Sequence, residues 1–115
     1  MNDLKSRTKQ FALDVIRLTS GLPHRLELQI ISRQLIRPAT SVAANYRSAC
    51  RGKSKADFIN KLSIVEEEAD ESALWLELLS DLSAGENATL QRLLDEAGQL
   101  TAIMVSSKKT ARGSE

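Results

Sequence analysis

The side chains best suited to chemistry in this 115-residue chain form a run of carboxylates, Glu66–Glu71, in which only Ala69 is not acidic. Paired carboxylates can act as general acid and base, or hold metal ions inside helix bundles. Successive residues of a helix, however, diverge by about 100°, so these side chains do not converge on one point. The Glu-x-x-His pattern of di-iron bundles is also absent. We therefore expect no catalytic residue, no metal site and no cofactor here.

The single cysteine and the single histidine exclude several further site classes. Cys50 alone allows neither an internal disulfide nor a multi-cysteine metal site, which fits a reducing cytosol, and we interpret it as a packing residue. His24 alone disfavours a histidine-dependent catalytic triad. Residues 1–10 lack the apolar core of a signal peptide, and the longest uncharged run, 97–107, is too short to span a bilayer. The sequence predicts a soluble, cytoplasmic protein that is not an enzyme and has no membrane partner.

Charge divides the chain into a basic and an acidic half. Residues 1–61 hold 12 Lys and Arg against 4 Asp and Glu, a net charge of +8, whereas residues 62–115 hold 4 against 11, a net charge of −7. On the second predicted helix, four arginines fall opposite the buried direction that Leu35 sets, and two lysines follow. The candidate nucleic-acid-binding residues are therefore Arg33, Arg37, Arg47, Arg51, Lys53 and Lys55. Three interpretations stay open: a solvated face, ion pairs with an acidic helix, or contact with RNA or DNA phosphates.

Apolar spacing that alternates threes and fours predicts the elements that position these charges. The stripes run over residues 4–22, within about 24–51, over 58–79 and over 90–104, with Ser54 and Asn87 as predicted N-caps. Few glycines and prolines argue against an all-β sandwich. The pattern indicates an all-α, antiparallel up-down four-helix bundle, with one domain over residues 1–107 and a polar tail over 108–115. Pro38 either kinks the second helix or divides it, and the unbroken spacing favours a kink.

The third predicted helix carries a second apolar stripe beside its core stripe, although a bundle helix needs only one. The predicted oligomer interface consists of Ile64, Glu68, Glu71, Leu74, Trp75 and Leu78. The only tryptophan then anchors a subunit contact, and the acidic rim meets the basic face of a neighbouring copy. The alternative is that Trp75 packs under a loop or against the tail.

A polar flank on the second predicted helix has a structural interpretation. It contains Gln34, Ser41 and Asn45, and the last of these falls at a core seam, where an amide is costly unless it is hydrogen-bonded. We expect this flank to hold a helix crossing in register rather than to bind a ligand.

Three motifs over residues 34–79 give a resemblance to a known family. They are Gln-x-x-Arg-x-Ala-x-Ser-x-x-x-Asn, Ser-Lys-x-x-Phe and Glu-x-Asp-Glu-x-x-x-Trp-Leu, carried by Gln34, Arg37, Ala39, Ser41, Asn45, Ser54, Lys55, Phe58, Glu68, Asp70, Glu71, Trp75 and Leu76. The chain resembles a bacterial four-helix-bundle family that includes the protein encoded by intervening sequences of 23S ribosomal RNA genes. The same family includes the accessory variability determinant of diversity-generating retroelements. The resemblance implies a homopentameric ring without catalytic activity and, in the retroelement branch, a basic surface that binds nucleic acid and a reverse transcriptase.

These observations lead to two functional hypotheses. The first is a non-enzymatic, ring-forming protein that contacts RNA or a nucleoprotein, such as a ribosomal RNA context, through its basic face. The second is a protein-binding adaptor or accessory subunit, for example of a reverse transcriptase, in which subunit pairing consumes that face. The residue pattern sets neither the partner nor the number of subunits.

Overall fold

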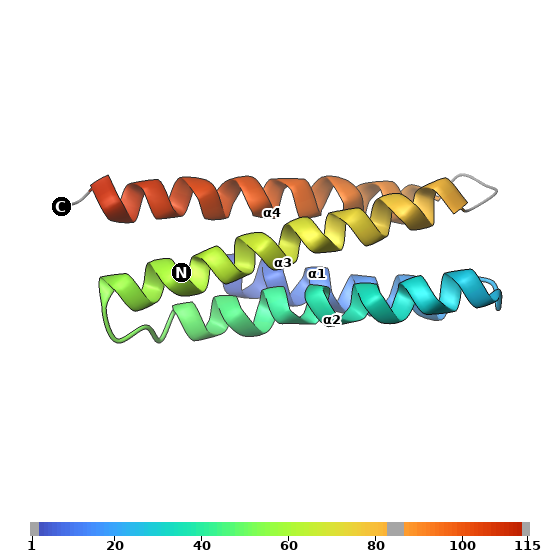
Figure 1. Cartoon of the computed structure of the whole chain (residues 1–115), viewed down its shortest axis with the longest axis horizontal. Coiled ribbons are helices and arrows are strands. Elements are labelled where there is room, and N and C mark those ends of the chain that lie inside the picture. Colours follow the sequence, from blue (N-terminus) through green and yellow to red (C-terminus); the bar gives the residue numbers. More distant parts are fainter. Residues whose placement is uncertain (1–2, 83–86, 114–115) are drawn as a thin grey trace.

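The computed structural model describes residues 3–82 and 87–113. The sequence also predicts a loop over residues 83–87, of which 83–86 lie outside the described residues. The four helices are α1 (Asp3–Ser20), α2 (Leu26–Ala49), α3 (Lys55–Leu82) and α4 (Ala88–Gly113). Neighbouring helices run antiparallel in a rod of 50 × 23 × 18 Å (Figure 1). The predicted all-α, antiparallel four-helix architecture is confirmed.

Helix α1 is much shorter than its partners. Its 18 residues span about 27 Å, whereas the 28 residues of α3 span about 42 Å. Helices α2 and α3 pack most extensively, followed by α3 with α4, and the edge between α1 and α4 is the least packed. At the end where α2 stops and α3 begins, α2, α3 and α4 extend beyond α1 (Figure 1).

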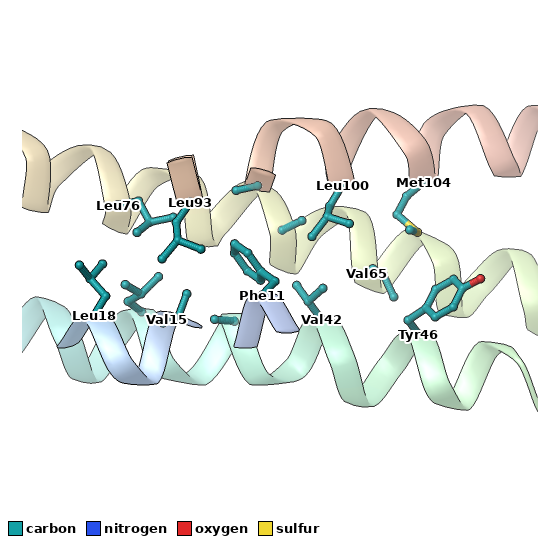
Figure 2. Close-up of a cluster of buried hydrophobic side chains, with 14 of the residues drawn as sticks. Phe11, Val15, Leu18, Val42, Tyr46, Val65, Leu76, Leu93, Leu100 and Met104 are labelled. Carbon is teal, nitrogen blue, oxygen red and sulfur yellow. The ribbon is translucent and has the colours of Figure 1, made fainter. Parts of the chain in front are cut away.

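The core follows the predicted stripes and is built mainly from leucine, valine and alanine. Phe11 of α1, Val42 of α2 and Leu100 of α4 are at most 1% exposed and point into the same cluster (Figure 2). Tyr46 and Met104 belong to this cluster too, toward the end that α1 does not reach (Figure 2). Burial of these apolar side chains is the main driving force that holds the four helices together.

The two predicted N-caps form as expected. The hydroxyl oxygen of Ser54 accepts a hydrogen bond from the backbone N–H of Asp57 at 3.0 Å, and the side-chain oxygen of Asn87 accepts one from the backbone N–H of Leu90 at 3.0 Å. The Asp57 carboxylate accepts a hydrogen bond from the backbone N–H of Lys53 at 3.3 Å, one residue earlier than in an ideal capping box. Local polar side chains thus fix where α3 and α4 begin.

Helices α2 and α4 test what the sequence predicts about their extent. Helix α2 runs without interruption through Pro38, so this proline does not divide it, and the kink stays a prediction. Helix α4 continues to Gly113, through residues that were expected to form a polar tail. The side chain of Lys108 lies on this extension and forms an ion pair with Glu66 of α3, with 2.7 Å between Nζ and Oε1. An ion pair with α3, rather than an apolar stripe, attaches this last part of α4.

Candidate functional site

A groove of about 520 Å³ runs between α1 and α2 on the outer surface of the bundle. We call it the basic groove; it is lined by Lys5, Lys9, Ala12, Thr40, Ala43, Ala44, Arg47, Ser48 and Arg51. Four of these residues are cationic, none is acidic, and the others have small side chains. The groove therefore combines a small-residue surface with positive charge from two helices.

Helical spacing explains why these four cations meet. Lys5 and Lys9 are four residues apart on α1, so they lie on one side of that helix. Arg47 lies in the last turn of α2, and Arg51 follows in the turn after it, where its backbone N–H donates a hydrogen bond to the carbonyl oxygen of Ser48. Because α1 and α2 run antiparallel, the N-terminal lysines of α1 lie beside the two arginines at the C-terminal end of α2. Residues far apart in the sequence thus form the two walls of one site.

Within residues 3–82 and 87–113, the four groove cations have no ion pair and no side-chain hydrogen bond with another residue. All four are exposed. An uncompensated cluster of one sign creates a local potential that attracts the opposite charge. The groove can therefore bind an anion without first breaking a contact of its own.

Arg37, which lies ten residues before Arg47 on α2, has a different environment. Arg37 lies 2.5 Å from a carboxylate oxygen of Glu71 and 3.6 Å from one of Glu68, both on α3. The indole N–H of Trp75 donates a hydrogen bond to the same Glu71 oxygen at 3.1 Å. We call Arg37, Glu68, Glu71 and Trp75 the α2–α3 seam. The Trp75 hydrogen bond, together with Arg37, lowers the pKa of Glu71 below its ordinary value.

The structure separates the six predicted nucleic-acid-binding residues. Arg33 lines a depression of about 380 Å³ near the loop between α1 and α2, and Lys55 lines one of about 680 Å³ beside Arg112. Lys53 is exposed in the loop before α3. Only Arg47 and Arg51 join the basic groove.

The two lysines on the other wall of the groove were missed from the sequence. Their four-residue spacing at the start of the first helix was the available signal, but that spacing says nothing about which neighbouring helix Lys5 and Lys9 face.

The predicted subunit interface is partly used inside the chain. Leu74 is 48% exposed, whereas Ile64, Leu78 and Trp75 are half-buried. Trp75 packs against the core rather than standing free as an anchor.

The expected acidic rim of that interface is also changed. Glu68 and Glu71 were expected to face a neighbouring copy, but Arg37 reaches across from α2 and pairs with both. The subunit contact itself stays a prediction, now without these two carboxylates as its free rim.

The polar flank of α2 is satisfied locally. The amide of Asn45 donates hydrogen bonds to the carbonyl oxygen of Ser41 at 3.1 Å and to its hydroxyl at 2.8 Å. Both bonds stay within one turn of α2, so among the described residues no side-chain bond from Asn45 to another helix fixes the crossing. Gln34 is exposed on the same helix.

The part of the chain that the structure describes contains neither a set of metal ligands nor a helix that could span a membrane. No three histidine, cysteine, aspartate or glutamate side chains come together there as a ligand set for a metal ion. Of the helices in this part, none is long and apolar enough to cross a membrane. What the described geometry offers is electrostatic binding at a groove, together with exposed apolar side chains.

The chain is similar in sequence to a known protein family and in fold to a solved structure. A family model described as 23S rRNA-intervening sequence protein matches residues 2–106. Among solved structures, the chain is similar to a protein of unknown function from the S23 ribosomal protein family of Bacteroides thetaiotaomicron. The two are 31% identical with a TM-score of 0.83, and the match covers 92% of this chain and 98% of the other. A search of curated proteins gave no match.

Proposed function

Because the chain belongs to the 23S rRNA-intervening sequence protein family, we propose that it is a non-enzymatic, self-associating protein that contacts RNA through the basic groove. The observation that carries the proposal is the set of four cations on two facing walls, without a partner among the described residues. Arginine and lysine in such a cluster bind phosphate oxygens, and each contact releases a counterion from the nucleic acid.

The shape of the groove favours an extended polyanion over a small anion. On α2 the lining residues Thr40, Ala44 and Arg47 are four and three residues apart, a row of about 10 Å, and Arg51 extends it in the turn after the helix. No aromatic side chain lines the groove, so it offers no platform on which bases could stack. We therefore expect contact with the sugar–phosphate backbone and no preference for particular bases.

The test is the salt dependence of RNA binding, measured by fluorescence anisotropy of a labelled single-stranded RNA. Contact with three or four phosphates gives a slope of about −2 to −3 in log K against log salt. We expect the double variant Arg47→Glu, Arg51→Glu to lower the affinity at least tenfold and to flatten the slope.

The matched control is the double variant Arg33→Glu, Lys53→Glu, because both residues are exposed, lie outside the groove and give the same change of net charge. It should change the affinity less than threefold. Equal losses in both variants would show that overall charge, not the basic groove, binds the RNA.

Self-association is supported by apolar side chains that the single chain leaves exposed. Leu26 is 72% exposed and Ile30 49% exposed on α2, while Leu74 is 48% and Leu82 38% exposed on α3. Apolar surface of this kind is typical of protein-binding sites when it is contiguous. A ring of copies, five by the resemblance, should sediment as a multiple of the 12.7 kDa chain, whereas the mass of one chain at all concentrations would contradict it.

The second candidate is an adaptor or accessory subunit that binds protein and does not touch nucleic acid. The same exposed apolar residues favour it, together with a net charge of only +1. Absence of RNA binding even at low salt, with self-association intact, would select this candidate.

A further inference from the structure

A second set of charges without partners lies on α3, on the side that faces away from the core. We call it the acidic stripe; it consists of Glu67, Asp70, Leu74, Glu77 and Asp81, all exposed. Successive members of this set are three, four, three and four residues apart in the sequence. This spacing places them on one face of the helix over about 21 Å. The face has an apolar centre, Leu74, with two carboxylates on either side along the helix.

The acidic stripe differs from the carboxylates next to it. Glu66, Glu68 and Glu71 pair with cations of their own chain, on α4 and α2. The four stripe carboxylates have no hydrogen bond or ion pair within residues 3–82 and 87–113. Four negative charges on a single helix face repel one another, so they gain most from an external cationic surface.

The basic groove has the matching arrangement of charge and shape. It carries four cations around small side chains, where the stripe carries four carboxylates around one leucine. The groove lies between α1 and α2, and α1 does not pack against α3, so the two surfaces do not meet within one chain. Charge complementarity therefore points to a second copy of this chain as the partner of each surface.

We propose that the acidic stripe of one copy docks into the basic groove of another, with Leu74 against Ala43 and Ala44, and thereby masks the groove from RNA. This inference rests on the proposed role of the groove in RNA binding. The contact joins two different surfaces, so repetition closes a ring or extends a chain. RNA and the second copy compete for the same four cations, so RNA loosens the assembly.

The first experiment measures self-association by sedimentation velocity for Leu74→Arg, with Ile16→Arg as the matched control. Both side chains are exposed, Leu74 at 48% and Ile16 at 40%, but only Leu74 lies in the acidic stripe. We expect Leu74→Arg to weaken self-association at least tenfold, and RNA to shift the wild-type chain toward smaller species. Association that Ile16→Arg abolishes and Leu74→Arg leaves unchanged would overturn the proposed contact.

The second experiment exchanges the charges across the contact. One protein carries Arg47→Glu and Arg51→Glu, the other carries Asp70→Lys and Glu77→Lys, and all four residues are exposed in the wild type. Each variant alone should associate at least tenfold more weakly than the wild type, whereas the mixture should associate again, because opposite charges face each other once more. A mixture that stays apart refutes the docking.

These measurements separate the docking from the proposed function. If the wild-type chain binds RNA but the charge-exchanged pair does not associate, the docking is wrong and the RNA role stands. If the pair associates but no protein binds RNA at low salt, the RNA role and the masking are wrong while the contact between copies is right. Circular dichroism confirms in each case that the variants are folded.

Discussion

Helix α2 carries arginines to two places with opposite electrostatic outcomes. At the α2–α3 seam, Arg37 meets two carboxylates of α3, and its charge is compensated inside the chain. About three turns further along the same helix, Arg47 lies beside lysines of α1, as does Arg51 in the turn after the helix, and neither arginine has an ion pair within the described residues. The arginines are chemically identical, so the neighbouring helix decides whether each one supports the fold or is available for binding.

The contrast extends to the acidic residues of α1. Asp14 could balance a cation, but it turns toward α4, where Arg92 lies 3.4 Å away, and it also faces Arg17 of its own helix at 3.9 Å. Nearer the start of α1, Arg7 pairs with Glu96 of α4 at 2.7 Å on the same edge. The charged side chains that α1 contributes to the lining of the basic groove are therefore Lys5 and Lys9.

The largest expected difference between the α2–α3 seam and the basic groove is in the unfolding free energy after a single charge reversal on α2. Arg37→Glu places a third carboxylate beside Glu68 and Glu71, and we expect the free energy of unfolding to fall by about 1.5 kcal/mol, a sum of lost and newly repulsive surface pairs. Arg47→Glu removes no contact and should change it by less than about 0.5 kcal/mol. Urea denaturation measures the unfolding free energy of both variants. Equal losses would contradict the proposed difference between the α2–α3 seam and the basic groove.

A smaller effect comes from the indole at the seam. Trp75→Phe keeps an aromatic ring against the core but loses the hydrogen bond to Glu71, which costs about 1 kcal/mol of unfolding free energy. The same substitution in a Glu71→Gln background should cost measurably less, because the charged acceptor is already gone. Identical costs in both backgrounds would show that this bond contributes nothing.

The smallest expected effect is the acid response of the seam. In the folded chain the pKa of Glu71 lies below its ordinary value of 4.5. The ionised carboxylate therefore stabilises the fold fully at pH values above 4.5, and this contribution is lost as the pH falls through the folded pKa. Between about pH 5 and pH 3, the unfolding free energy of Glu71→Gln should therefore fall less than that of the wild type. Glu67→Gln, at an exposed position without a partner in the described residues, should follow the wild type.

Much of the fold was predictable because local rules fix it. Apolar spacing placed the four helices, and the capping residues Ser54 and Asn87 marked two of the starts. The extension of α4 to Gly113 was not predicted, because residues 106–113 carry no apolar stripe and are attached through Lys108 to another helix. A contact between helices of this kind leaves no trace in the spacing of either one.

The site was less predictable for the same reason. Helical geometry predicts that Arg33, Arg37, Arg47 and Arg51 point away from the core, but not which helix lies beside each of them. Ion pairing with an acidic helix is one of the three open interpretations, and within the described residues it holds for Arg37 but not for the other three arginines. The lysines of the other groove wall belong to α1, whose own residue spacing does not show that it borders α2.

The position of the basic groove also sets an order of assembly. Its walls come from α1 and the α2 side, which are sequential neighbours and pack together, whereas the Arg7–Glu96 pair closes a separation of 89 residues across the least packed edge. Local closures form earlier in folding than long ones, so we expect α1 to pair with α2 before it meets α4. Both walls of the basic groove are then in place before the bundle closes, and a nascent chain acquires this surface from its first two helices.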